Sequence, residues 1–515
     1  MSSPTLAHPR AHRTSAEFWP ILIFTPFVLL FGMALGLFGV PFGVGLIGLL
    51  LLVASFFIPL RFLFWLLVII TFWLSGPIQY FGHIQKIFWL PYLLGALLMG
   101  RALATQLFNK HEPPRTEEGK AALPIFKTLL WIWLLGLVAS SLFNAASPFQ
   151  VLLSMKEYIF LWGGGLVLAW GLIKPEAVDR VFRHSIWFLL VQFPVILYQR
   201  FVVAAKRVGP SSWDSVVGLM SGDPEGGGAS ATMALIVILI MVYHLAAWRF
   251  GRCRLPLLLL VIGLGLASIM LAEVKFAVIL IPIAFAMVYG RHILRRPLFG
   301  ISFLLVALAM GYLIVFAYQS QFAGDGSKGS RSVDAYVEEV IERNTGDDQI
   351  NFLTGEMGRI AALKFWWSNH SLGEPMHVVL GHGIGASRIG MVEGEIAKRF
   401  RFEIGRSTLV ILLWEGGILA AIGLVTMLGV AVVRGFRVAQ QATMPEQQTV
   451  LTTAAVGLAI TLLMTPYGPD LFSVSQAQLL AILLIVRILA TPARFVPSHP
   501  IATSMPPQQV KLRSP

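Results

Sequence analysis

The stretch VVLGHGIGASRIG at residues 378–390 concentrates groups that could do chemistry in a chain that is otherwise mostly apolar. It holds four glycines with a histidine, which exchanges protons near neutral pH, and an arginine, whose planar fork suits phosphate oxygens. Its residues formally match the pattern G-x-G-x-x-A, but a dinucleotide site needs a whole βαβ unit, so we reject that interpretation. Two interpretations stay open: a flexible turn that re-enters the membrane, or a loop whose glycines bring backbone amides and His382 close to a ligand.

Basic residues between apolar segments are further candidates. Lys275, next to Glu273, is charged between two expected membrane spans, where a charge is costly and therefore suggests a function. The alternative is a simple ion pair between Glu273 and Lys275 at the membrane surface. Arg200 and Arg207 belong to a basic patch in the segment 200–228.

The elements that must position these groups are membrane helices. Of the 515 residues, 56% are hydrophobic and 13% are charged, far fewer charges than the roughly 25% of soluble domains. Several segments approach the ~20 apolar residues that cross a bilayer as a helix. The sequence predicts an all-α polytopic membrane protein with helices near 18–39, 41–57, 59–76, 87–105, 124–144, 151–173, 180–203, 229–248, 254–271, 274–290, 297–318, 407–433, 449–466 and 473–490.

We therefore expect about fourteen transmembrane helices and one large, partly helical external loop. The expected order is a cytoplasmic tail (1–17), eleven transmembrane helices (18–318), the external loop (319–405), three more transmembrane helices (406–490) and a second cytoplasmic tail (491–515).

The distribution of charge orients this arrangement. Most of the 39 Lys and Arg residues fall in segments on the side of the two tails, so both termini are expected in the cytoplasm. The net charge of +13 is then a topology signal, and no nucleic-acid partner is needed to explain it. The single cysteine, Cys253, excludes an internal disulfide and a thiolate metal site.

The external loop is too long for a mere connector, which indicates a function. We expect a first helix with Val337 and Val340 on its apolar face. The segment 350–369 should form a second helix whose apolar stripe lies against the membrane or the helix bundle. Arg359 shares this segment without belonging to the stripe.

Three blocks in sequence order, TGEMGRIAALKFW, VLGHGIGAS and GRSTLVILLWEGGILAAIGL, resemble the signature region of the O-antigen ligase and O-antigen polymerase (Wzy-type) superfamily of bacterial membrane glycosyltransferases. The similar region runs from about residue 350 to 425. Upstream, GLMSGDPEGGGASATMALIVIL and LAEVKFAVILIPIAF resemble the family's entries to two membrane helices. The resemblance implies an enzyme at the periplasmic face of the bacterial inner membrane that uses a polyprenyl diphosphate-linked glycan as donor, without metal, cofactor or nucleotide sugar.

The resemblance also implies roles for basic residues. Arg359 matches the family's Gly-Arg, and a departing diphosphate needs fixed cations. Arg207 and Gly218 have the Arg-x10-Gly spacing described for some polymerases. The residues expected to bind the diphosphate or the glycan are Arg200, Arg207, Lys275, Arg359 and Arg388.

The general base has several candidates. Family members begin the re-entry helix with His-Asn nine residues before the glutamate, here Glu415, and Arg406 occupies that position instead. Either His382 has taken over as base, or a carboxylate such as Glu356 or Glu403 serves, or Arg406 only binds phosphate. His382 and Arg406 are our catalytic candidates.

Two further acids have mainly structural interpretations. We expect Glu415 to be buried in the bundle and hydrogen-bonded. Asp470 lies in TPYGPD at the last external turn, where it either breaks a helix or touches the sugar, and we favour the turn.

The expected function is polymerisation of lipid-linked oligosaccharide units into a bacterial polysaccharide, because the chain lacks the histidine that the ligase pattern emphasises. Transfer of the glycan to lipid A core or protein by a ligase is the alternative. A lipid-linked glycan flippase or transporter, which would predict internal repeats and charges in several spans, is an alternative of another class, and a structural role in a secretion complex is a further one. The implied partners are the lipid-linked oligosaccharide, the lipid bilayer, and chain-length regulator and export proteins, with no nucleic acid.

Overall fold

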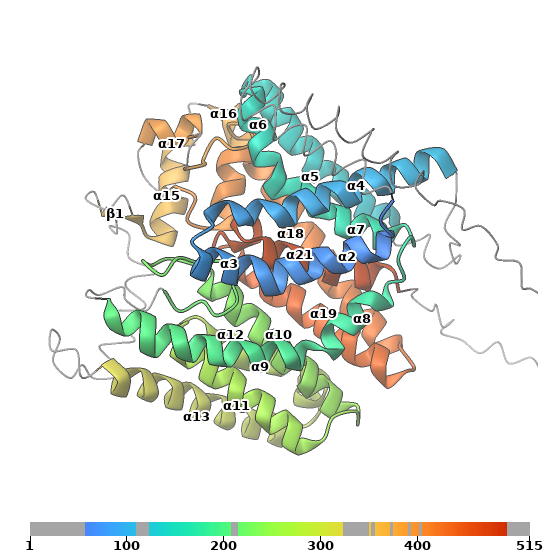
Figure 1. Cartoon of the computed structure of the whole chain (residues 1–515), viewed down its shortest axis with the longest axis vertical. Helices are drawn as coiled ribbons and strands as arrows, with labels where there is room; N and C mark the ends of the chain where they lie inside the picture. The colour runs from blue at the N-terminus through green and yellow to red at the C-terminus, as the bar shows by residue number, and fades with distance from the viewer. Residues whose placement is uncertain are drawn as a thin grey trace, which may run out of the picture. The chain divides into compact units, whose positions relative to one another are not determined.

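The computed structural model describes residues 57–109, 123–207, 215–322, 350–351, 356–370, 374–389, 393–400 and 404–491. The chain divides into two compact units, residues 1–63 and residues 64–515, and the second contains the elements discussed below apart from the first four residues of the helix Leu60–Ile69. The described chain is almost entirely helical (Figure 1). Its two strands, β1 (Ile350–Asn351) and β2 (Glu356–Met357), pair antiparallel with Ile350 opposite Met357.

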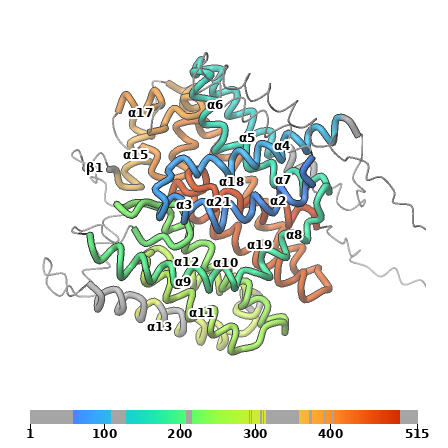
Figure 2. The backbone as a smooth tube through the Cα atoms, viewed as in Figure 1, coloured from blue at the N-terminus to red at the C-terminus, as the bar shows by residue number. Residues whose placement is uncertain are grey.

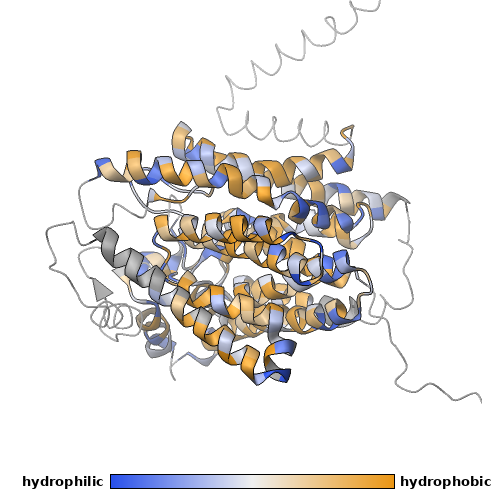
Figure 3. Ribbon diagram, turned by 90° about the horizontal axis from the view of Figure 1, so that it is seen from below, coloured by the Kyte–Doolittle hydropathy of each residue, from blue (hydrophilic) through white to orange (hydrophobic). Residues whose placement is uncertain are grey.

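Six helices of the described residues are long and apolar enough to cross a membrane, or seven if the bent pair Pro148–Phe160 and Trp162–Ala169 forms one span. The six are Leu60–Gly82 (α2, Leu60–Ile69; η1, Ile70–Leu74; α3, Ser75–Gly82), Gln85–Leu107 (η2, Gln85–Phe88, and most of α4, Trp89–Asn109), Ser185–Lys206 (α9, Ser185–Tyr198; η5, Gln199–Val203; η6, Ala204–Lys206), Ser230–Arg249 (α10), Thr408–Gln441 (α18) and Pro445–Met464 (α19). Apolar residues cover most turns of these helices (Figure 3), as expected where the solvent is lipid.

Further helices complete the described part of the chain. They are α5 (Leu123–Phe143), α6 (Pro148–Met155), η4 (Lys156–Phe160), α7 (Trp162–Ala169), α8 (Glu176–Arg183), α11 (Leu255–Leu271), α12 (Ala277–Arg295), α13 (Pro297–Phe322), α15 (Arg359–His370), α16 (Pro375–Leu380), α17 (Glu395–Phe400), α20 (Asp470–Ser473) and α21 (Ser475–Leu489).

The expected all-α membrane class is confirmed in this part of the chain. A helix lies at each expected membrane range that falls within the described residues. The expected helix 350–369 is shorter than predicted: it begins only at Arg359, because β1 and β2 pair in the part before it. The expected helices 18–39 and 41–57, the helix around Val337, and Glu403 lie in ranges that are not described, apart from Phe57. The structure supports six or seven crossings by length and composition, and the total of fourteen stays a prediction.

Four expected helices depart from regular geometry. The range 59–76 contains the π-helix η1. The range 151–173 is broken into α6, the π-helix η4 and α7, with a bend of 41°. Helix α9 ends in the π-helix η5. Helix α18 is interrupted at Gly417, whose φ is +64°. Since π-helices and breaks in membrane helices occur where the backbone serves a site, these positions point to candidate functional regions.

The C-terminal helices form the centre of the packing. Helix α18 packs on α5 and α19, α21 packs on α7, and α19 also packs on α10 (Figures 1 and 2). Helix α10 is buried over most of its length, which explains why its sequence is apolar on all sides.

Contacts within the second unit join loops that were expected on the same side of the membrane. At one end, Thr232 Oγ1 donates to Asp470 Oδ2 at 2.6 Å. At the other end, Arg487 forms a buried ion pair with Asp179 at 2.5 Å, and Arg252 pairs with Glu446 at 2.9 Å. These contacts agree with the expected alternation of the helices, and they leave open which end faces the cytoplasm.

Candidate functional site

The turn after α16 inserts into the break of α18. The carbonyl oxygen of Trp414 accepts a hydrogen bond from the amide of His382 at 2.7 Å, and that of Glu415 accepts one from the amide of Gly383 at 3.0 Å. Ser140 on α5 donates to the same Glu415 carbonyl at 2.6 Å. The backbone groups near the break are thus satisfied by the turn and by α5, as a low-dielectric interior requires.

Glycine is required where the turn meets the break. A Cβ on Gly381, whose φ is +68°, would lie 2.6 Å from the nitrogen of Gly417, and one on Gly417 would lie 2.2 Å from the oxygen of Val379. The amide of Ile384 donates to Ser141 Oγ at 3.1 Å, and that of Gly385 to Glu415 Oε2 at 2.7 Å. These glycines therefore allow close packing of the turn on α18, and the amides of residues 382–385 bond within the protein.

Glu415 holds this turn, as expected from the sequence. Its side chain is 3% exposed. Its carboxylate accepts hydrogen bonds from Tyr158 Oη at 2.6 Å, the amide of Gly385 at 2.7 Å and Ser387 Oγ at 2.7 Å. A carboxylate with this many donors is stabilised where it lies, so its role is to position the turn.

The imidazole of His382 is engaged by other histidines. Its Nε2 lies 2.8 Å from Nε2 of His370, and its ring stacks on that of His377 with centroids 4.4 Å apart. Burial, followed by the nearby His377, His370 and Arg399, lowers the pKa of His382 to about 3. An imidazole with so low a pKa accepts a proton poorly at neutral pH, so this environment does not favour His382 as the general base.

Arg388 faces the broken helix α6–η4–α7. Its guanidinium lies 3.8 Å from Glu157, which in turn pairs with Lys156 at 2.5 Å. The ammonium of Lys156 is buried among the rings of Phe88, Trp89 and Tyr92, at 4.9, 4.9 and 5.1 Å from their centroids. The sequence analysis missed Lys156 and Glu157, although two adjacent charges inside an apolar span were a signal that could have identified them.

A second cluster surrounds Arg359 at the start of α15. The guanidinium lies 3.8 Å from the centroid of the Tyr467 ring, and its Nε donates to the carbonyl oxygen of Tyr467. On the other side, the ring of Phe276 is parallel to Tyr467, with centroids 4.0 Å apart and an interplanar angle of 9°. Three planar groups from distant parts of the chain thus form one stack, which fixes the guanidinium plane.

Charged groups lie close to this stack in the chain and in space. Lys275 precedes Phe276 and lies 3.6 Å from Glu273, as the ion-pair alternative anticipated. Asp470 follows Tyr467 by three residues, and its carboxylate accepts from Thr232. Burial raises the pKa of Asp470, while the hydrogen bond from Thr232 and the charge of Arg359 act against that rise.

A small cavity of about 20 Å³ lies beside Asp470, large enough for one water molecule. Its polar lining includes Thr408, Thr461 and Thr465. Thr408, two residues after Arg406, donates through its amide and hydroxyl to the carbonyl of Gly468, each at 2.9 Å. Arg406 therefore belongs to the same end of the bundle as Arg359 and Asp470.

The predicted site residues fall into separate groups. Arg359 and His370 lie at opposite ends of α15, ~16 Å apart along a helix of 1.5 Å rise per residue. Arg200 is buried in η5, and Arg207 donates to the carbonyl of Glu225. The amide of Gly218 donates to Gln199 Oε1 at 2.6 Å, and its carbonyl accepts from Gln199 Nε2 at 3.0 Å. The backbone of Gly218 is therefore engaged by Gln199. The structure therefore associates Arg406 and the Lys275 segment with Arg359, and it separates His382 and Arg388 from them.

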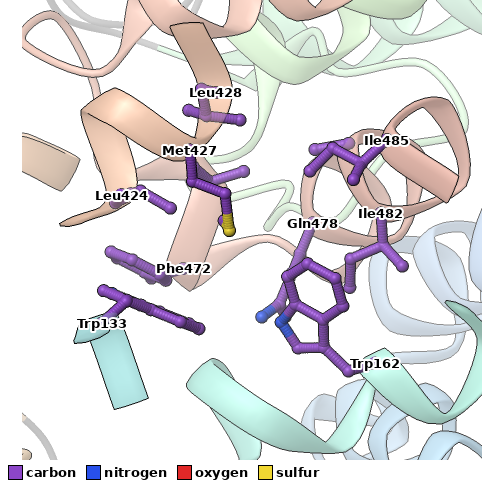
Figure 4. A pocket seen from close by; sticks show the side chains of 11 residues that line it. Trp133, Trp162, Leu424, Met427, Leu428, Phe472, Gln478, Ile482 and Ile485 are labelled. Atoms are coloured by element: carbon purple, nitrogen blue, oxygen red, sulfur yellow. The ribbon is translucent and has the colours of Figure 1, made fainter. Parts of the chain in front are cut away.

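A second cavity of about 20 Å³ lies deeper in the bundle, between α5, α7, α18 and α21 (Figure 4). Its lining is mostly apolar and includes Trp133, Trp162, Met427 and Phe472, with Gln478 as the polar member. Within the described residues, no group of three or more His, Cys, Asp and Glu side chains is arranged to hold a metal ion.

The sequence matches no protein-family model and no curated protein.

Proposed function

We propose that the protein is a membrane glycosyltransferase that polymerises polyprenyl diphosphate-linked oligosaccharide units at the periplasmic face of the bacterial inner membrane. The order of the sequence blocks supports this function. The main structural support is the stack of Arg359, Tyr467 and Phe276 beside Lys275 and Asp470, because it combines fixed cations with a carboxylate at one end of a helix bundle.

In the proposed reaction, Arg359 and Lys275 bind the diphosphate of the donor. A guanidinium held flat against Tyr467 offers N–H groups in a fixed plane, which matches the planar geometry of phosphate oxygens. Negative charge grows on the diphosphate as it leaves, so a cation that is already oriented stabilises the transition state more than the ground state. Arg406, at the same end of the bundle, is a third cation for this role.

We assign the general base to Asp470 in place of His382. A hydroxyl of the acceptor sugar attacks the anomeric carbon of the donor and forms the new C–O bond. The bond from that carbon to the diphosphate oxygen breaks, and its electron pair leaves with the lipid diphosphate. The hydroxyl proton passes to Asp470. Burial raises the pKa of this carboxyl group, and the charge of Arg359 limits the rise. The carboxylate is therefore a better proton acceptor than a typical aspartate.

The other predicted residues receive supporting roles. Arg388 and Glu157 connect the turn after α16 to the broken helix, and Arg207 closes the turn around Glu225. The multi-pass inner-membrane location, cytoplasmic termini, and chain-length regulator and export proteins as partners belong to the same proposal.

The test is chain extension by the full-length protein in nanodiscs, supplied with polyprenyl diphosphate-linked repeat units and followed by the length distribution on a gel. We expect a ladder for the wild type and its loss in Arg359→Ala. Arg359→Lys keeps the charge but loses the planar stack, so it should restore only part of the activity. Arg183→Ala is the matched control, because Arg183 pairs with Glu446 at the opposite end of the bundle.

The other functions predict different outcomes in the same preparation. A ligase would leave the repeat units at one length and transfer them when lipid A core or a protein acceptor is added. A flippase would move lipid-linked glycan across liposomes without changing it. Either result, with no ladder from the wild type, would overturn the polymerase assignment.

A further inference from the structure

Three histidines from consecutive elements meet beside Trp414. His370 ends α15, His377 lies in α16 and His382 lies in the following turn (Figure 1). The rings of His370 and His382 have centroids 5.0 Å apart, and those of His377 and His382 are 4.4 Å apart at 14°. Their hydrogen-bond partners are specific enough to assign where each proton lies.

His370 and His382 are both neutral. Nδ1 of His370 lies 2.7 Å from the carbonyl oxygen of Trp366, which only accepts, so Nδ1 carries the hydrogen. Nε2 of a neutral His370 is then an acceptor. Because it lies 2.8 Å from Nε2 of His382, the latter must donate. One N–H···N hydrogen bond therefore links the end of α15 to the turn.

His377 ties the cluster to the segment after α5. Its Nδ1 lies 2.9 Å from the carboxylate of Glu374, and its Nε2 lies 3.0 Å from Oδ1 of Asn144. The amide nitrogen of Asn144 donates to the carbonyls of Ser140 and Gly381, so the atom facing His377 is the oxygen. His377 and Asn144 thus form a second connection to the turn, through the carbonyl of Gly381.

We propose that His370 and His382 form an acid-sensitive latch that holds the turn 381–389 against α15, closed while Nε2 of His370 is free of a proton and accepts from His382. A proton added to Nε2 of His370 sets its N–H against the N–H of His382, so this hydrogen bond is lost. The latch therefore opens as the pH falls.

The neighbouring charged groups do not hold an added proton in the closed cluster. Arg399 on α17 acts against a positive charge at His382. Glu374 is already close to His377, at 2.9 Å. On α18, the carboxylate of Glu415 is committed to Gly385, Ser387 and Tyr158, so it offers no compensation for an added cation.

The latch follows from these hydrogen bonds and does not require glycan transfer. Its functional consequence, which does rest on the proposed function, is regulation: α15 carries Arg359 at one end and His370 at the other. Loosening the end of α15 at His370 should therefore disturb the stack at Arg359 and lower the transferase activity at acid pH.

The test is hydrogen–deuterium exchange of the full chain in nanodiscs at pH 5 and pH 7, with labelling times scaled to the intrinsic exchange rate. We expect peptides covering 375–389 to exchange about tenfold faster at pH 5 than at pH 7, because the open state binds the added proton more readily than the closed state. Peptides covering residues 449–464 of α19, which contain no histidine, should not change. A flat profile for 375–389 in the wild type would overturn the latch.

Variants test the assignment of the two histidines. The double variant His370→Gln, His382→Gln should lose the acid response, whereas His184→Gln at the other end of the bundle should keep it. Retention of the full wild-type profile in the double variant would also exclude the proposal. Because exchange is measured without substrate, its outcome is independent of the chain-extension assay.

Discussion

Two regions of the same loop-bearing end contrast in how they use polar groups. The turn 381–389 is the most conspicuous motif in the sequence, yet the amides of residues 382–385 and the carboxylate of Glu415 bond to one another, to α5 and to α18. The region around Arg359 carries only a Gly-Arg pair as its sequence signal, but it combines a guanidinium stacked on Tyr467 with the half-buried side chains of Lys275 and Asp470. The glycine-rich pattern thus marked a packing joint, and the charged groups of the candidate site lie elsewhere.

The largest effect expected from this contrast concerns activity. Asp470→Asn should slow chain extension by about a hundredfold or more, since it removes the proposed base while keeping the shape of the side chain. His382→Gln should slow it by less than about tenfold, because a general base is not lost. The initial rates of both variants on lipid-linked units would measure this difference. A reversed order would return the base to His382.

The packing joint should be the more sensitive region for stability. Gly417→Ala places a Cβ 2.2 Å from the carbonyl oxygen of Val379 at a residue with φ of +64°. We expect a loss of about 3 kcal/mol or more in the free energy of unfolding. Gly429→Ala is the control in the same helix, since its Cβ would meet no atom within 4 Å. Equal thermal midpoints for the two variants in detergent would contradict the role of the break.

A smaller loss is expected from the acid that holds the turn. Glu415→Gln keeps the volume but turns one acceptor into a donor against Tyr158, Gly385 or Ser387. The stability should fall by about 2 kcal/mol. Glu395→Gln, on the exposed face of α17, should leave it unchanged. Thermal unfolding monitored by circular dichroism would compare them, and a neutral Glu415→Gln would show that the carboxylate charge is not needed.

The smallest effect is the acid dependence of stability. The folded protein lowers the pKa of His370 and His382 from the usual 6.5, in the case of His382 to about 3. Below pH 6.5 the unfolded chain therefore binds protons that the folded chain excludes, so stability falls as the pH drops from 6.5 toward 3. The thermal midpoint should decline over this range and decline less in His382→Gln. If the thermal midpoint declined equally in the wild type and in His382→Gln, His382 would be excluded as a cause of the decline.

The helices were predictable because the apolar composition of a membrane segment leaves the backbone few alternatives. Each expected range within the described residues contains a helix. The break at Gly417 and the bend after η4 were not expected, since both depend on which segment packs beside them. The candidate site was predicted only in part: Arg359 was identified by its resemblance to a family motif, whereas its partners Tyr467 and Phe276 were not.

The sequence by itself determined the helical membrane class, because hydrocarbon admits few backbone arrangements that satisfy every N–H and C=O group. It also identified several of the charged residues that had to be explained, although not Lys156 and Glu157. Only the tertiary structure decided their contacts, because hydrogen bonds and charge effects act over a few ångströms between residues far apart in the chain. Tyr467 lies 108 positions after Arg359 in the chain, and its carbonyl accepts a hydrogen bond from that arginine. His382 lies 12 positions after His370, and the two imidazoles are joined by a hydrogen bond.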